Sequence, residues 1–285
     1  MSTYALKKPL DESTHATLRE LFEAAEAMGV QVCLIGAQAR ILWLTHIHGL
    51  EAARATRDTD FAVQIDDWEQ FAALSAHLID HHGWRKDLKQ SQRFFSATDQ
   101  MVDLVPCGGV AVGDEISWPP DHAHRMDVRG FELTMSEGVH IDVGDGCQVT
   151  IAPLHVLALL KVISWWDRGT AAEKDAVDLI ALLRSYADAE AHDLLTLDEH
   201  LDLYELEDDH EQRGARLVGR LIAAAAETAT LDLARRVLEE GIDESGSMKL
   251  VSQAAEALTG DIDTRTEAAY GLLTALGRGL NERSA

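Results

Sequence analysis

Two aspartates, Asp58 and Asp60, stand two residues apart where the apolar run from Phe61 to Ile65 begins. Residues i and i+2 of a β-strand point to the same face, so both carboxylates would project together from the end of a sheet. Carboxylate oxygens are the ligands that hard divalent cations prefer. The spacing therefore indicates a divalent-metal site, although two such acids could also only cap a turn.

A third acid, Asp103, lies inside the apolar segment from Met101 to Val105, which is typical of a buried strand. Because an unpaired buried charge costs free energy, Asp103 needs a partner, such as a metal ion. Upstream, the apolar run from Val32 to Ile35 stops at Gly36, and Ala37 begins a predicted helix. The unpaired N–H groups at such a strand-to-helix exit can bind an anion, as at many phosphate sites.

These residues occur in the order of a known family. Gly36-Ala37, the Arg54-x-Thr56-x-Asp58-x-Asp60 run and the Asp103 strand resemble the nucleotidyltransferase superfamily, whose motifs are Gly-Gly or Gly-Ser, then Asp-x-Asp, then a later strand Asp. Lys161 and the run from Asp167 to Leu179 are similar to the distal motifs of the AbiEii-type branch, which includes toxins of bacterial toxin–antitoxin pairs. Ala37 replaces the second family Gly or Ser; the hydroxyl is lost and the backbone N–H remains.

The resemblance implies a metal-dependent site that binds a nucleoside triphosphate. Two Mg²⁺ ions, with Mn²⁺ as a substitute, would be held by Asp58, Asp60 and Asp103. The N–H groups of Gly36 and Ala37 would meet the β and γ phosphates. Arg54 and Thr56 belong to the turn that carries the aspartates and to the expected substrate site.

The resemblance also places Lys161 beside the triphosphate, as a source of positive charge. Lys174 and Asp175 would complete the nucleotide site. The residues themselves leave two alternatives open. Lys161 could be a surface lysine whose stem covers apolar residues, and Asp175 could simply pair with a neighbouring lysine or arginine.

Composition restricts the classes of partner. The chain of 285 residues has 25 Lys and Arg against 49 Asp and Glu, a net charge of −24. An extended basic surface for duplex DNA is absent, so an RNA substrate would need a local basic patch. No P-loop and no Gly-x-Ser-x-Gly motif occurs. No apolar run approaches the about 20 residues of a membrane helix, and the start lacks a secretory segment, so we expect a cytoplasmic protein.

The expected fold is α/β. A mixed sheet flanked by helices would form a nucleotidyltransferase-like catalytic domain over residues 1–187, followed by a helical C-terminal region over 188–285. The C-terminal expectation depends on apolar residues at helical spacing, such as Leu217 and Leu221. The three cysteines are far apart and are expected to be core thiols without a disulfide.

The expected function is transfer of a nucleoside monophosphate from a triphosphate to an acceptor. The toxin branch implies that the acceptor is an RNA end, particularly that of tRNA, or a protein hydroxyl, and that an antitoxin is a partner. Two alternatives remain open. One is modification of a small molecule such as an aminoglycoside, which suits the negative charge. The other is a non-catalytic binding protein on a degenerate nucleotidyltransferase core, motivated by Ala37.

Overall fold

The chain divides into two compact units. A computed structural model describes residues 4–50, 56, 58–169, 173–189 and 194–282. Its backbone contacts separate an N-terminal unit, Met1–Pro153, from a helical unit, Leu154–Ala285. The first two helices after Pro153 pack on the later helices of the chain. The predicted extent of a catalytic domain to residue 187 stays a prediction.

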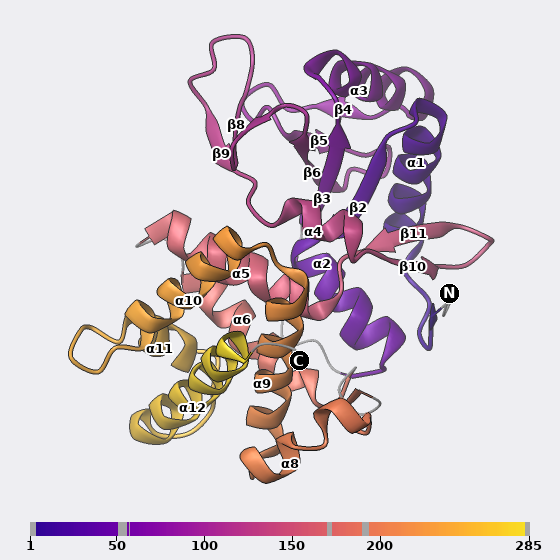
Figure 1. Cartoon of the computed structure of the whole chain (residues 1–285). Coiled ribbons are helices and arrows are strands. Elements are labelled where there is room, and N and C mark those ends of the chain that lie inside the picture. Colours follow the sequence, from indigo (N-terminus) through magenta and orange to yellow (C-terminus); the bar gives the residue numbers. More distant parts are fainter. Residues whose placement is uncertain (1–3, 51–55, 57, 170–172, 190–193, 283–285) are drawn as a thin grey trace. The chain divides into compact units, whose positions relative to one another are not determined.

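The N-terminal unit is built on a mixed sheet, which confirms the predicted α/β class. Within the described residues, one sheet has eight strands in the order β1-β10-β11-β2-β3-β6-β5-β4 and another has the order β7-β8-β9 (Figure 1). The strands of the larger sheet are β1 (Tyr4–Ala5), β2 (Gln31–Ile35), β3 (Asp58–Ile65), β4 (Arg85–Lys86), β5 (Arg93–Phe95), β6 (Met101–Gly108), β10 (Val139–Asp142) and β11 (Gln148–Ile151). The smaller sheet contains β7 (Ala111–Val112), β8 (Glu115–Ser117) and β9 (Arg125–Asp127). At the centre β3 runs parallel to β6, while β2 and β5 are antiparallel to their neighbours β3 and β6.

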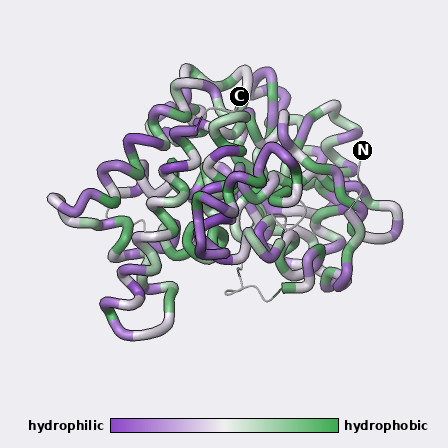
Figure 2. The backbone as a smooth tube through the Cα atoms, turned by 60° about the horizontal axis from the view of Figure 1, so that its bottom comes forward, coloured by the Kyte–Doolittle hydropathy of each residue, from purple (hydrophilic) through white to green (hydrophobic). Residues whose placement is uncertain are grey.

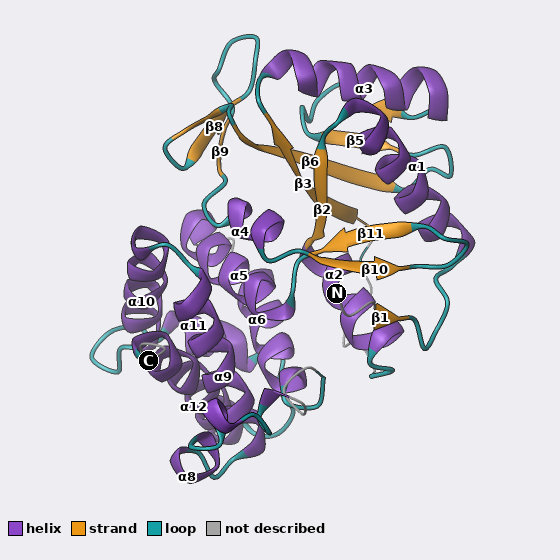
Figure 3. Cartoon of the chain, turned by 45° about the vertical axis from the view of Figure 1, so that its right-hand side comes forward, coloured by secondary structure: helices purple, strands orange, loops and turns teal. Residues whose placement is uncertain are grey.

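Helices cover both faces of the central strands (Figure 3). The helices α1 (Glu12–Met28) and α3 (Trp68–His82) pack on each other and on one face. On that face, Phe61 of β3 contacts Phe22 of α1, with ring centroids 6.3 Å apart. The other face is covered by α2 (Gly36–Ile41) and α4 (Phe131–Ser136), and α2 continues as the π-helix η1 (Leu42–Ile47).

Local capping signals explain where the first helix lies. The Asp11 carboxylate accepts a hydrogen bond from the Thr14 backbone N–H, which satisfies one of the free donors at the start of α1. Gly29 ends the helix in the left-handed conformation. Both ends of α1 are therefore set by residues next to the helix. The three cysteines are free thiols as predicted, and burial raises the pKa of both Cys33 and Cys107 to about 12.

The helical unit contains the remaining helices. They are α5 (Leu154–Arg168), α6 (Glu173–Tyr186), η3 (Asp198–His200), α8 (Leu203–Leu206), α9 (His210–Ala225), α10 (Thr228–Ile242), α11 (Lys249–Ala255) and α12 (Ile262–Asn281). Hydrophobic and hydrophilic segments alternate along the chain (Figure 2), as expected for helices that bury one face. This confirms the predicted helical C-terminal region. No helix in the described residues combines the length and apolar character needed to cross a membrane.

The helices α9 and α12 approach each other closely. A Cβ atom added to Gly279 of α12 would overlap the backbone oxygen of Arg216, and one added to Gly219 of α9 would overlap that of Leu276. Residues with side chains would therefore hold these backbones apart. Two small residues at one crossing allow the two helices to bury their apolar faces against each other.

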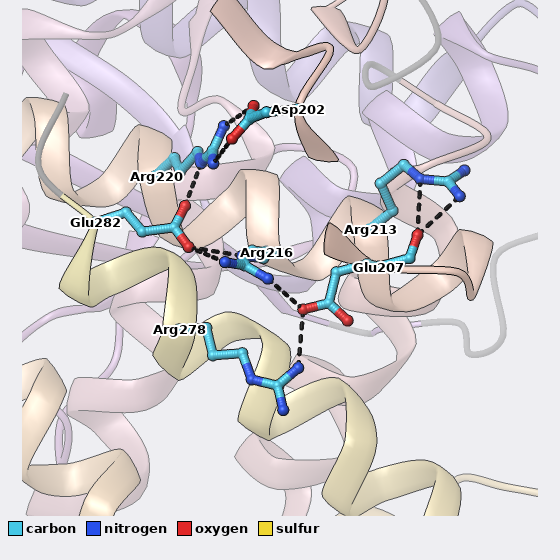
Figure 4. Close-up of polar contacts among 7 residues, drawn as sticks. All are labelled: Asp202, Glu207, Arg213, Arg216, Arg220, Arg278 and Glu282. Atoms are coloured by element: carbon cyan, nitrogen blue, oxygen red, sulfur yellow. Dashed lines mark hydrogen bonds and ion pairs between the residues drawn. The ribbon is translucent and has the colours of Figure 1, made fainter. Parts of the chain in front are cut away.

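A charged network ties the ends of these helices together. It involves Asp202, Glu207, Arg213, Arg216, Arg220, Arg278 and Glu282 (Figure 4). The Glu207 carboxylate, whose side chain is only 6% exposed, accepts from Arg216 Nη1 at 2.7 Å and from Arg278 Nη1 at 2.9 Å. Arg216 and Arg220 both donate to Glu282, just after α12. The network thus joins the segment after α8, the helix α9 and the end of α12.

Candidate functional site

The sheet brings the three predicted aspartates to one face. In the register of the parallel pair β3–β6, Asp60 lies opposite Asp103, and Asp58 precedes Asp60 by two residues on the same strand. Residues in register on paired strands point to the same side, as do residues i and i+2. The face is the one covered by α2 and α4, because the Asp60 carboxylate lies against Gly36 at the start of α2.

Gly36 allows the backbone to come close to Asp60. Its φ is +70°, in the left-handed region that favours glycine. A Cβ atom at this position would also overlap Asp60 Oδ2. The strand β2 ends at Ile35, which is in register with Asp60, and α2 starts at Gly36, one residue before the predicted start. Ala37 follows in the first turn and is half-buried. No side chain caps the start of α2.

Thr56 supports the first aspartate. Its hydroxyl donates to the Asp58 carboxylate and lies 3.2 Å from the Asp58 backbone oxygen. This pairing holds one oxygen of the Asp58 carboxylate. Asp58 and Asp60 are both half-buried. The predicted site residue Arg54 lies outside the described residues.

The partner of Asp103 is an arginine. Arg93 of β5 lies directly opposite Asp103 of β6, and donates from Nε to Oδ1 and from Nη2 to Oδ2, both at 2.8 Å. The side chains are 25% and 12% exposed respectively. These hydrogen bonds to Asp103 raise the pKa of Arg93 although burial opposes the shift, and the charge of Asp58 adds to the increase. The partner that buried Asp103 requires is therefore Arg93 in the structure, and the role of Asp103 as a metal ligand stays a prediction.

The sequence analysis did not predict that Arg93 is the partner of Asp103, although the strand pattern contains this information. The segments from Arg93 to Ala97 and from Met101 to Val105 read as neighbouring short strands. Pairing them as a hairpin places a basic residue across from the buried acid, and opposite charges in cross-strand pairs are favourable. The signal was missed because the register of the hairpin has to be known before the partner can be named.

Metal binding by the three aspartates stays a prediction. Among the described residues, no group of three or more His, Cys, Asp or Glu side chains is arranged to hold a metal ion. Mg²⁺ is usually bound by one or two carboxylates together with substrate phosphates and water, so a site of this kind is completed by the substrate.

The other predicted site residues lie in the helical unit. Lys161 of α5 donates from Nζ to Asp175 Oδ1 at 2.9 Å and to Asp178 Oδ2 at 2.8 Å, and Arg168 Nη1 lies 3.1 Å from Asp175 Oδ2. Asp175 is only 1% exposed. Burial alone would lower the pKa of Lys161, but Asp178 and Asp175 outweigh it and raise that pKa.

This cluster favours one of the open alternatives. Asp175 pairs with the neighbouring basic residues Lys161 and Arg168. The Lys161 ammonium lies between the carboxylates of Asp175 and Asp178 and is not a solvated surface group. Lys174 is exposed at the start of α6. The predicted residues thus form two groups, one in each unit. The roles of Lys161, Lys174 and Asp175 in nucleotide binding stay predictions.

Comparison with known proteins gives matches among solved structures alone. No family model and no curated protein matches the sequence. One similar structure is an antigenic nucleotidyltransferase-like protein from Paracoccidioides brasiliensis, with 14% identity, a TM-score of 0.39, and coverage of 62% of this chain and 78% of that chain. Another is the Thermotoga maritima CCA-adding enzyme complexed with tRNA, with 12% identity, a TM-score of 0.28, and coverage of 98% and 85% respectively.

Proposed function

We propose that the chain is a nucleotidyltransferase that moves a nucleoside monophosphate from a triphosphate to an acceptor. The observation that carries the proposal is the meeting of the Asp58 and Asp60 face with the glycine turn at Gly36. Two carboxylates on one sheet face, next to a backbone turn without a Cβ atom, make a compact place for a metal-bound phosphate chain. The motif order in the sequence points to the same chemistry.

Each of these residues in the N-terminal unit has its own role in the proposed reaction. The backbone N–H groups of Gly36 and Ala37 donate to the terminal phosphates, and the missing Cβ atom of Gly36 leaves room beside Asp60. Thr56 fixes the rotamer of Asp58 through its hydroxyl. Asp58 and Asp60 would hold one Mg²⁺ or Mn²⁺ ion, which when bound neutralises charge on the phosphates and on the leaving group.

The net charge of the chain and its resemblance to the toxin branch suggest different acceptors. A net charge of −24 repels a polyanion and attracts a cation, which favours a small cationic acceptor such as an aminoglycoside. A tRNA end or a protein hydroxyl, with an antitoxin as partner, is the acceptor that the toxin branch suggests. Both classes of acceptor would use the same phosphate site, and the transfer assay distinguishes between them.

The test is transfer of label from each α-labelled nucleoside triphosphate with Mg²⁺ or Mn²⁺ present. Total tRNA and a panel of aminoglycosides serve as acceptors. We expect label to move to one acceptor class, and Asp58→Ala to reduce the rate at least about 100-fold, because an electrostatic contact to the reacting phosphates is lost. Asp66→Ala, a change at an exposed aspartate just after β3, is the matched control and should keep wild-type activity.

Two outcomes would contradict the proposal. Transfer by Asp58→Ala protein at the wild-type rate would mean that the chemistry takes place elsewhere. Absence of both transfer and triphosphate binding in a folded protein would instead favour a binding protein on a degenerate core. Triphosphate binding without transfer would direct the search to further acceptors.

A further inference from the structure

An arginine and an aromatic ring lie on the sheet face that carries Asp58. We propose that Arg85 and Phe95 form a stacking subsite for an unpaired nucleobase, in a nucleic-acid strand whose reacting end lies at Asp58. The inference deepens the proposed function and rests on it for the place of the reaction. It names the acceptor as a nucleic-acid strand, and binding of such a strand can be measured without any transfer reaction.

The register of the sheet sets these residues in one row. Met101 of β6 is the partner of Asp58 on β3 and also of Phe95 on β5. Phe95 is in turn the partner of Arg85 on β4, where the order of the described strands ends (Figure 3). Register partners project to the same side, so the row extends the Asp58 face to that end of the sheet. Lys86 points to the opposite face, where its Nζ lies over a ring of the aromatic core.

Two contacts hold the Arg85 guanidinium in position. Its Cζ lies over the Phe95 ring, 5.3 Å from the ring centroid, and its Nη2 donates to the Asp99 carboxylate. Asp99 belongs to the turn between β5 and β6. Backbone hydrogen bonds of 2.9 Å, from Ser96 N to Gln100 O and from Asp99 N to Ser96 O, close this turn. The turn therefore fixes the carboxylate that orients the guanidinium.

The stack is accessible from solvent. The side chains of Arg85 and Asp99 are 64% and 78% exposed, and Phe95 is half-buried. Because an ion pair this exposed contributes little to stability, its main effect is to hold the guanidinium plane. Guanidinium planes and aromatic rings are the groups on which proteins stack unpaired bases. A base on the outer side of Arg85 would meet a plane that is already in place and supported by Phe95.

The local charge suits a polyanion although the whole chain is acidic. The segment 84–99 has four basic residues and two acidic ones, in a chain whose net charge is −24. They are Arg85, Lys86, Lys89 and Arg93 against Asp87 and Asp99. Basic side chains attract the phosphates of a strand and repel a cationic aminoglycoside. This end of the sheet thus supplies the local basic patch that an RNA substrate needs.

The distance from Asp58 sets the length of strand that can reach the subsite. Neighbouring strands lie about 4.8 Å apart, which puts Phe95 about 10 Å and Arg85 about 14 Å from Asp58 along the row. Stacked nucleotides follow one another at about 3.4 Å. A strand with its reacting end at Asp58 therefore brings roughly its fifth nucleotide to Arg85, and a dinucleotide is too short.

The experiment measures binding of fluorescein-labelled oligoadenylates of two and six nucleotides to the whole chain. Fluorescence anisotropy is recorded in EDTA, so that no transfer takes place. We expect the wild type to bind the longer strand at least about 10-fold more tightly. Arg85→Gln and Phe95→Leu should each weaken binding of the longer strand about 10-fold, as for the loss of one stacked base, and leave binding of the dinucleotide unchanged.

Three further measurements separate stacking from charge and from triphosphate binding. Arg85→Lys keeps the charge without the guanidinium plane and should lose nearly as much affinity as Arg85→Gln. Lys86→Gln is the matched control, because it removes one charge from the same strand on the opposite face, and it should stay within about twofold of the wild type. Arg85→Gln should bind ATP with Mg²⁺ as tightly as the wild type does.

Several results would overturn the inference. They are equal affinity of the wild type for both strands, absence of binding of the longer strand, wild-type affinity in Arg85→Lys, and a loss in Lys86→Gln as large as in Arg85→Gln. Weaker ATP binding by Arg85→Gln would assign the stack to the base of the triphosphate and overturn it as well.

The proposed function can fail separately. Strand binding that depends on length and on Arg85, without label transfer to any acceptor, would keep the subsite and remove the transferase assignment. Label transfer to an aminoglycoside by a chain that does not bind the longer strand would do the reverse.

Discussion

Glu207→Ala is expected to lower the free energy of unfolding of the helical unit by about 3 kcal/mol, because breaking a buried ion pair leaves an uncompensated charge. The Glu207 side chain accepts from Arg216 and Arg278, and the Arg216 side chain is only 12% exposed. Arg216 keeps Glu282 as a second partner, so the loss should lie at the lower end of the range for buried pairs.

Urea unfolding followed by circular dichroism measures this loss. Glu205→Ala removes an exposed glutamate from α8, two residues away, and is expected to change stability by less than about 0.5 kcal/mol. Arg278→Ala should fall between the two, because the Arg278 side chain is 53% exposed. Equal effects of Glu207→Ala and Glu205→Ala would show that the network does not contribute to stability.

Gly36→Ala is expected to destabilise the N-terminal unit by about 2 to 5 kcal/mol. Two costs add. An alanine with a φ of +70° is strained by about 1 to 2 kcal/mol. The new Cβ atom also overlaps Asp60 Oδ2, and crowding of this kind typically costs about 1 to 3 kcal/mol. The displaced carboxylate should in addition lower both Mn²⁺ binding and label transfer.

Gly29→Ala separates the two costs. Gly29 has a φ of +64°, yet a Cβ atom there would meet nothing within 4 Å. Both variants therefore carry backbone strain, and only Gly36→Ala carries crowding. Urea unfolding of the two proteins gives the crowding cost as the difference, and Gly29→Ala should retain wild-type Mn²⁺ binding. If the two variants unfold at the same urea concentration and bind Mn²⁺ equally well, the close contact between Gly36 and Asp60 affects neither stability nor metal binding.

Local patterns in the sequence predicted much of the N-terminal unit. The strand that stops at Gly36, the strand that begins at Asp58 and the buried strand around Asp103 all depend on apolar runs and turn residues within a few positions. Such signals need no knowledge of distant contacts. The inward direction of Asp175 was predictable for the same reason, because the helical repeat alone sets it.

What the sequence left open depends on pairing between distant segments. The partner of Asp103 could not be chosen without the register of β5 on β6, and a shift of one residue would turn Arg93 to the opposite face. The packing of the first two helices after Pro153 was open for a similar reason. The periodicity of residues 154–186 shows that they form helices, but it does not show whether their apolar faces pack on a sheet or on the later helices.

The hairpin of β5 and β6 also bears on the order in which the sheet assembles. Arg93 and Asp103 are ten residues apart in the chain, whereas α3 and β4 lie between β3 and β6. Because short loops close sooner than long ones, we expect the guanidinium to reach Asp103 before Asp58 and Asp60 arrive. Pulse-labelled hydrogen exchange during refolding should then protect the β5–β6 amides before those that join β3 to β6. The aspartates would thus come together only after a counter-charge is already in place.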